Sequence, residues 1–165
     1  MKVFIPYKSD GGRRDRIADY TKTLFWEPNG FEVVYLANDD EEFNVSKARN
    51  LALNYDEEIL LFSDSDSIPD IRLLRRAIDT ALQRNTMVFP FNTALELNKP
   101  TSDWHLDNGV IPKNTRPPQA EYIRRRADEL QGSIYAIPRS VFEKVGGFDE
   151  KFVGWGHEDL AFVKK

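Results

Sequence analysis

Apolar and polar residues follow one another along this chain with two different spacings. Short apolar runs predict buried strands, and these runs lie at residues 3–5, 31–36, 59–62 and 87–91. Between them, apolar residues recur every three or four positions, which predicts helices over residues 13–26, 46–55 and from 70 onward. Strands that alternate with helices in this way predict an α/β fold with a mostly parallel sheet flanked by helices.

Boundary residues and buried faces are predicted for each of these three helices. The first is expected to end at Pro28-Asn29-Gly30, Ser46 is the expected N-cap of the second, and Pro69 with Asp70 opens the third. The side chains expected to face the core recur at helical spacing: Ile17, Tyr20 and Leu24, then Ala48, Leu51, Ala52 and Tyr55, then Ile71, Leu74, Ile78 and Leu82.

The C-terminal half departs from this regular alternation. Residues 98–120 are rich in Pro, Asn and Asp, which predicts a long loop that either faces a substrate or is disordered. Residues 121–130 are expected to form a short helix, on which the three arginines at 124–126 are a solvated face or a phosphate clamp. A strand over 132–137 and a short helix over 138–145 are expected next, and Gly146-Gly147 ends that helix.

The most informative polar motif is Asp64-Ser65-Asp66, at the end of the apolar run predicted as a strand at 59–62. Ligands bind outside the carboxyl ends of parallel strands in open α/β sheets, so these two carboxylates are expected beside a binding crevice. Carboxylates held close together raise each other's pKa, and a divalent cation between them removes that penalty. Oxygen ligands suit Mg²⁺ or Mn²⁺, which would in turn hold a diphosphate. The alternative is an acidic turn whose aspartates only cap a helix.

A second acidic pair, Glu158-Asp159, follows a stretch rich in glycine and aromatic residues. Glycine permits close approach of the backbone to a ligand, and Trp155 offers a flat face on which a sugar ring can pack. A carboxylate beside such a face is suited to act as a general base. The alternative is a helix N-terminus that carries acids because the helix dipole favours them there.

Composition narrows the classes of function. The 165 residues fit one domain with a real core, and 41% hydrophobic with 30% charged residues is an ordinary soluble composition. A net charge of −4 argues against nucleic acid as the main partner. The absence of cysteine excludes disulfides, thiolate metal sites and a cysteine nucleophile. No apolar run is long enough for a transmembrane segment and the N-terminus lacks a signal-peptide core, so a cytoplasmic location is expected.

Five segments occur in a definite order along the chain: Pro6-Tyr7-Lys8, Asn44-Val45-Ser46-Lys47-Ala48-Arg49-Asn50, Asp64-Ser65-Asp66, Val145-Gly146-Gly147-Phe148-Asp149-Glu150 and Trp155-Gly156-His157-Glu158-Asp159. Together they resemble glycosyltransferases of the GT-A fold, specifically the family 2 enzymes and the galactosyltransferase-like C-terminal segment. The Asp-x-Asp alone is a weak signal, whereas the string from Gly146 to Asp159 is specific. The resemblance implies one GT-A (Rossmann-like) domain over residues 1–165, short at its C-terminus.

At the donor end, the resemblance implies a metal-dependent enzyme that uses a nucleotide-diphosphate sugar, with a UDP-sugar expected. Asp66 would ligate Mn²⁺ or Mg²⁺, and Asp64 would support that metal site beside the ribose or sugar. The donor would also be contacted by Pro6, Tyr7, Lys8 and Arg49.

At the acceptor end, the resemblance implies a glycan or other hydroxyl acceptor and inversion at the anomeric carbon. Trp155 and Gly156 would line the acceptor pocket. Asp159, or in second place Glu158, would deprotonate the acceptor hydroxyl.

The chain also departs from the family pattern, which leaves alternatives open. Such enzymes usually continue past the Glu-Asp helix and often add a histidine ligand, whereas this sequence ends at Lys165 and holds only His105, expected to be exposed, and His157. The first alternative is a non-catalytic module of the same fold that binds a nucleotide sugar or glycan. The second is a haloacid-dehalogenase-type phosphatase, although Ser67-Ile68-Pro69 does not continue its motif. The apolar surface at 160–163 predicts self-association into a homo-oligomer.

Overall fold

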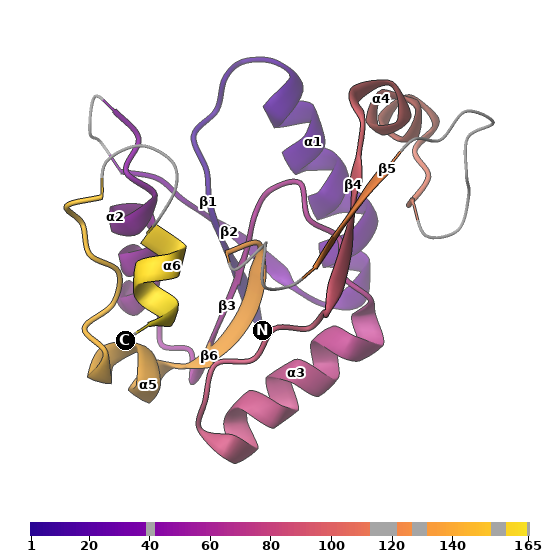
Figure 1. Ribbon diagram of the computed structural model, residues 1–165. Coiled ribbons are helices and arrows are strands. Elements are labelled where there is room, and N and C mark those ends of the chain that lie inside the picture. Colours follow the sequence, from indigo (N-terminus) through magenta and orange to yellow (C-terminus); the bar gives the residue numbers. More distant parts are fainter. Residues whose placement is uncertain (39–41, 113–121, 127–131, 153–157, 165) are drawn as a thin grey trace.

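A central sheet of four strands organises the molecule (Figure 1). The computed structural model describes residues 1–38, 42–112, 122–126, 132–152 and 158–164. The sheet order is β2-β1-β3-β6, with β1 at Lys2–Pro6, β2 at Glu32–Leu36, β3 at Ile59–Ser63 and β6 at Ile134–Pro138. β1 runs parallel to β2 and β3, whereas β6 is antiparallel to β3. The predicted α/β fold with a mostly parallel sheet is confirmed.

Each face of this sheet carries its own hydrophobic core, because successive strand residues point to opposite faces. One face receives Val3, Ile5, Ile59, Leu61, Ile134 and Ala136, and the other receives Phe4, Leu60, Phe62, Tyr135 and Ile137. None of these side chains is more than 3% exposed. Burial on both faces explains why the strands are nearly continuous apolar runs in the sequence.

Two groups of helices cover the two faces and lie on opposite sides of the sheet in Figure 1. The first core is closed by the π-helical turn η1 (Lys22–Trp26) and by α3 (Ile71–Arg84), and α1 (Arg13–Thr21) lies on the same side of the sheet in Figure 1. The second core is closed by α2 (Val45–Asn50), the 3₁₀ turn η3 (Leu51–Asn54), α5 (Arg139–Lys144) and α6 (Glu158–Val163). The sheet is therefore the middle layer of three.

The predicted inward faces of these helices need two corrections. Leu24 and Leu82 are predicted to face the core, but they are 37% and 40% exposed. Leu24 and Trp26 both lie in the π-helical turn η1, whose wider spacing departs from the α-helical spacing used for the prediction, and Trp26 is buried there instead of Leu24. On α3, Ala81 is fully buried and takes the inward position beside Ile78.

Helix boundaries agree with the sequence prediction except at α2. Its N-cap is Asn44, not Ser46, because the Asn44 side chain accepts a hydrogen bond from the Lys47 N–H at 2.9 Å. Ser46 lies inside the helix and is fully buried. Asp70 caps α3 as predicted. The 3₁₀ turn η2 (Glu27–Asn29) ends at Gly30, whose φ of 84° favours glycine.

The segment from residue 87 to residue 126 differs most from prediction. Residues 87–91 make only one isolated bridge, between Val88 and Ala136, instead of a strand. The predicted loop after residue 98 begins with helix α4 (Lys99–Asn108), and the helix predicted at 121–130 is instead β5 (Tyr122–Arg126). β5 pairs antiparallel with β4 (Thr93–Leu97) in a second, two-stranded sheet. Residues 113–120 of the predicted loop lie outside the described residues.

Helix α4 also corrects the prediction for His105. This histidine is 3% exposed, and its ring Nδ1 lies 2.9 Å from the Val110 carbonyl oxygen. Asn98 caps the helix by accepting a hydrogen bond from the Thr101 N–H at 2.9 Å, and Gly109 ends it with φ at 61°. The turn at Gly109 brings the Val110 carbonyl back to the imidazole, so the buried ring has a backbone partner.

The surface of the described residues bears on two further predictions. Leu160 and Val163 of α6 are each 39% exposed, so the face on which we predict self-association is open to solvent. Among the described helices, none is long and apolar enough to cross a bilayer.

Candidate functional site

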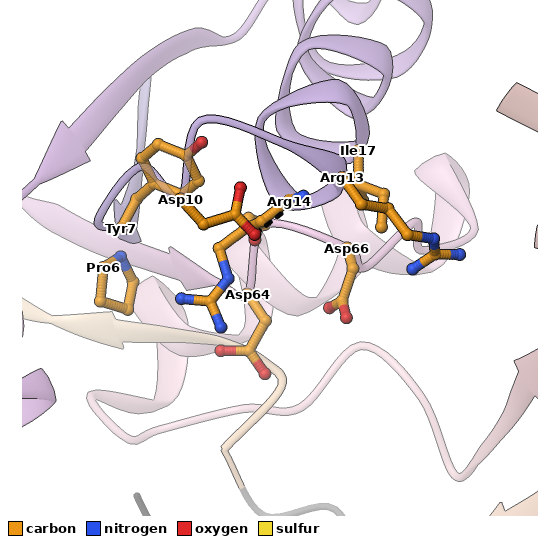
Figure 2. A pocket seen from close by; sticks show the side chains of 9 residues that line it. Pro6, Tyr7, Asp10, Arg13, Arg14, Ile17, Asp64 and Asp66 are labelled. Atoms are coloured by element: carbon orange, nitrogen blue, oxygen red, sulfur yellow. Dashed lines mark hydrogen bonds between the residues drawn. The ribbon is translucent and has the colours of Figure 1, made fainter. Parts of the chain in front are cut away.

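A cavity of about 390 Å³ opens where β1 and β3 end (Figure 2). These two strands are parallel, so their carboxyl ends lie at the same edge of the sheet. The cavity is lined by the residues after β1, the start of α1 and the acidic triplet: Pro6, Tyr7, Asp10, Arg13, Arg14, Ile17, Asp64, Ser65 and Asp66. The triplet therefore lies where the sequence predicts it, at a crevice outside the strand ends.

Hydrogen bonds hold the backbone of the triplet on both sides. The Asp64 N–H donates to the Ser133 carbonyl at 2.8 Å, directly before β6. The buried Thr21 hydroxyl on α1 donates to the Ser65 carbonyl at 2.8 Å. The Ser67 N–H donates to the Asp64 carbonyl at 3.3 Å and closes the turn. The two carboxylates are therefore presented by a well-anchored backbone.

The two carboxylates of the triplet have different environments. Asp66 is exposed, whereas the Asp64 side chain is 33% exposed, and Figure 2 shows both carboxylates pointing the same way. Burial against the surrounding protein raises the pKa of Asp64 to about 7, while Arg49 opposes this shift and Asp66 adds to it. A cation near Asp64 would favour its charged form at neutral pH.

The loop between β1 and α1 is arranged around the carboxylate of Asp15. Asp15 accepts hydrogen bonds from the Tyr7 hydroxyl, from the Ser9 hydroxyl at 2.7 Å and from the Asp10 N–H at 3.3 Å. These bonds, led by the one from Tyr7, lower the pKa of Asp15. They hold Tyr7 at the cavity wall, whereas the neighbouring Lys8 is exposed and does not line the cavity.

Two arginines that the sequence reasoning missed line the same cavity. Arg13 and Arg14 are the first residues of α1, directly after the turn at Gly11-Gly12. Figure 2 shows the Arg14 guanidinium pointing toward the space beside Asp64, while that of Arg13 points away. The Arg13 Nε lies 2.8 Å from Asp103 Oδ1 on α4. The sequence does contain a signal for these two residues, because the two arginines directly follow the turn after the first strand.

The second acidic pair begins α6 and contacts a buried arginine. The Arg49 Nη1 lies 2.6 Å from Asp159 Oδ1 and 3.4 Å from Glu158 Oε1. Glu158 is only 5% exposed, whereas the Asp159 side chain is 24% exposed. Burial raises the pKa of Asp159 to about 6 against the opposing effect of Arg49. Asp159 is therefore the more accessible carboxylate of the pair.

The turn at residues 147–150 precedes this pair and is held by α2. Asn50 Oδ1 accepts from the Phe148 N–H at 2.9 Å, and Asn50 Nδ2 donates to the Phe148 carbonyl at 3.1 Å. Asn44 Nδ2 donates to the Glu150 carbonyl at 2.9 Å. These bonds join residues that are 98 and 106 positions apart in the chain, so the two motifs form one structural unit.

Apart from Lys8, which does not line the cavity, the predicted site residues fall into three groups. The cavity is lined by Pro6, Tyr7, Asp64 and Asp66. Arg49, Glu158 and Asp159 form an ion-pair cluster, which reaches Asp64 because Arg49 Nη2 lies 3.6 Å from Asp64 Oδ1. The predicted acceptor contacts Trp155 and Gly156, together with His157, lie outside the described residues.

Asp64 and Asp66 fit a divalent cation in part. Both present carboxylate oxygens to one cavity, which is the ligand type that Mg²⁺ and Mn²⁺ prefer. Within the part of the chain that the structure describes, no group of three or more His, Asp or Glu side chains gathers for metal binding. The other ligands of an ion held here would be phosphate oxygens and water, as is usual for Mg²⁺.

The arrangement of helices around a mostly parallel sheet is that of the GT-A fold. Residues 119–165 match the family described as the N-terminal domain of galactosyltransferase. The chain is similar to the catalytic domain of Drosophila β1,4-galactosyltransferase 7 in complex with xylobiose, with a TM-score of 0.57. It is also similar to a point mutant of that enzyme in complex with manganese, UDP-Gal and xylobiose, with a TM-score of 0.55.

Sequence identity and coverage determine which conclusions these similarities support. Each comparison has 18% sequence identity and covers 99% of this chain but 59% of the Drosophila chain. At this identity the likeness establishes the fold. No curated protein sequence matches the chain.

Proposed function

We propose that this chain binds a UDP-sugar and transfers its sugar to an acceptor hydroxyl in a metal-dependent, inverting reaction. The observation that carries the proposal is the pair of acidic groups joined by Arg49: Asp64 at the cavity, and Asp159 on α6. The similar Drosophila enzyme in complex with manganese, UDP-Gal and xylobiose supports the same class of donor, metal ion and acceptor. UDP-galactose is therefore the first donor to test.

At the donor end, Asp66 and Asp64 would hold Mn²⁺ or Mg²⁺. When bound, such an ion neutralises the charge that develops on the leaving diphosphate. Asp66 is the proposed main ligand because it is exposed, and Asp64 would support it from the cavity wall. Pro6 and Tyr7 would flank the nucleotide, and the Arg14 guanidinium adds positive charge to the same cavity.

At the acceptor end, Asp159 would accept the proton of the acceptor hydroxyl. The acceptor oxygen then forms a bond to the anomeric carbon, while the bond between that carbon and the diphosphate oxygen breaks and UDP leaves. Attack from the side opposite the leaving group inverts the configuration. A pKa of about 6 supports this role, because the carboxylate is charged at neutral pH and is a stronger base than an ordinary aspartate. Trp155 and Gly156 remain proposed acceptor contacts.

Calorimetry with UDP, in the presence and absence of Mn²⁺, tests the donor end. We expect UDP binding that requires the metal ion and that is lost in Asp66→Asn. Asp19→Asn is the matched control, because it removes an exposed carboxylate of α1 that does not line the cavity. Unchanged UDP affinity in Asp66→Asn would contradict the metal assignment.

Transfer from UDP-galactose to xylobiose tests the reaction itself. We expect Asp159→Asn to bind UDP like the native chain and to lose transfer. Saturable UDP binding without transfer to any acceptor would instead favour a non-catalytic binding module. Release of phosphate from a phosphomonoester would favour the phosphatase alternative.

A further inference from the structure

The geometry points to Arg49 as a positioning residue that holds the donor-end carboxylate of Asp64 and the acceptor-end carboxylate of Asp159 in one fixed relation. This role differs from the donor contact that the sequence resemblance implies for Arg49. Its consequence for transfer rests on the proposed function, whereas the coupling between the two carboxylates is a property of the folded chain.

The Arg49 guanidinium is buried among other protein groups. The residue is 2% exposed and is absent from the lining of the cavity. Its Cζ lies 5.0 Å from the centre of the Phe148 ring, a cation–π contact that covers one face of the guanidinium. A donor in the cavity would therefore contact Asp64 and Asp66, while Arg49 stays buried.

One planar guanidinium joins the two ends of the site. Its Nη1 lies 2.6 Å from Asp159 Oδ1, and its Nη2 lies 3.6 Å from Asp64 Oδ1. Arg49 Nε is buried and has no hydrogen-bond partner among the described residues, so the contacts to these carboxylates are made by the two terminal nitrogens. Because the guanidinium plane holds these nitrogens at a fixed angle, moving one carboxylate relative to the other breaks a contact.

Charge explains why a cation is needed at this point. The carboxylates of Asp64, Glu158 and Asp159 each have an oxygen within 3.6 Å of an Arg49 nitrogen. Carboxylates gathered in this way repel one another, and a buried carboxylate left without a cation is strongly destabilising. Arg49 attracts all three, so the cluster is compact only while the arginine is present.

The space around Asp159 fixes its position from another side. A Cβ built at Gly132 would lie 1.9 Å from Asp159 Oδ2, so the carboxylate occupies the space that any other side chain would fill. Arg49 Nη2 also donates to the Gly132 carbonyl at 3.4 Å. The arginine and the glycine together determine where the proposed base stands relative to the cavity.

A thermodynamic cycle based on melting temperatures tests this coupling and requires no activity assay. Melting temperatures are measured for Asp64→Asn, Asp159→Asn and the double variant, first in the native chain and then in the Arg49→Lys background. In the native chain we expect the melting-temperature shift of the double variant to differ from the sum of the two single shifts. In the Arg49→Lys background we expect this difference to shrink, because the single ammonium of lysine cannot contact both carboxylates as the two terminal guanidinium nitrogens do. Additive shifts in the native chain, or equal non-additivity in both backgrounds, would overturn the inference.

The transfer assay tests the catalytic consequence. We expect Arg49→Lys to lower kcat by about tenfold or more, since small misplacements of reacting groups are costly. Its affinity for UDP with Mn²⁺ is expected to stay within about twofold of the native value, which separates positioning from donor binding. A loss of UDP affinity with an unchanged kcat would overturn the inference, because it would make Arg49 a donor contact.

Arg139→Lys is the control for the loss of a structural arginine. Arg139 Nη2 donates to the Leu53 carbonyl at 2.8 Å and lies outside the cavity. We expect this variant to lose stability while kcat stays unchanged. If the native chain neither binds UDP nor transfers a sugar, the proposed function fails, and the thermodynamic cycle by itself then decides the role of Arg49.

Discussion

Replacing Gly147 by alanine probes the contact between α2 and the turn before the second acidic pair. Gly147 has a φ of 65°, and a Cβ there would lie 2.6 Å from Asn50 Oδ1. That oxygen accepts the hydrogen bond of the Phe148 N–H, and the Nδ2 of the same amide donates to the Phe148 carbonyl. The methyl group must therefore displace the amide that holds the turn.

Gly146→Ala is the matched control for this substitution. Gly146 also has a positive φ, 77°, but a Cβ there meets no described atom within 4 Å. The control therefore measures the cost of the left-handed conformation alone, about 1–2 kcal/mol. Gly147→Ala adds the loss of two hydrogen bonds at about 0.5–1.5 kcal/mol each, so we expect it to lose about 1–3 kcal/mol more than the control.

Urea unfolding followed by circular dichroism measures the two free energies. In a chain of this size each kcal/mol also lowers the melting temperature by about 2–4 °C, which gives a second reading. Equal losses in the two variants would show that Asn50 does not hold the turn. That result would refute the reasoning that joins α2 to the residues before α6.

Four further predictions concern the core, a helix cap and the pH dependence of stability and of transfer. Leu74→Ala, at 0% exposed, is expected to cost about 2–5 kcal/mol in urea unfolding, whereas Leu73→Ala, at 48% exposed on the same helix, changes stability by about 0.5 kcal/mol or less. Equal losses would contradict the buried face of α3. Asn44→Ala removes the N-cap of α2 and is expected to cost about 1 kcal/mol, and an unchanged melting temperature would contradict that cap. Because the pKa of Asp159 is raised to about 6, the folded chain binds this proton more tightly than the unfolded chain, so its contribution to stability falls as pH rises from about 4 through about 6. In the proposed reaction, transfer would need the charged base and is expected to rise with pH and level off above about 6, so a flat rate across this range would contradict Asp159 as the base.

Strands of the central sheet could be predicted because their signal is local. All five residues of β3 are buried, and the first four, Ile59 to Phe62, form an uninterrupted apolar run that can be recognised without knowing the neighbouring strands. The strand at 122–126 could not be predicted in this way, because it exists through pairing with β4 and its own sequence also suits a helix. β-Structure depends on neighbours across the sheet more than on the residues of one strand.

The part of the candidate site that could be predicted from the sequence is the part whose position follows from the sheet topology. A polar motif directly after a parallel strand must lie at the carboxyl edge of the sheet, so Asp64 and Asp66 were expected at the cavity. Arg13 and Arg14 were missed because the start of a helix reveals neither which side chains face a cavity nor which elements bend toward it. Arg14 reaches the space beside Asp64, whereas Arg13 is held by Asp103.

By itself, the sequence determined the alternation of strands and helices, the order of the five motifs and the position of one acidic group at a strand end. Only the tertiary structure decided that Arg49 lies between Asp64 and Asp159, and that Asn50 holds the turn at residues 147–150 by hydrogen bonds. The physical reason is the difference between separation along the chain and distance in space. Helix and strand periodicity arises between residues a few positions apart, whereas ion pairs and hydrogen bonds act over a few ångströms between groups that only the folded sheet brings together.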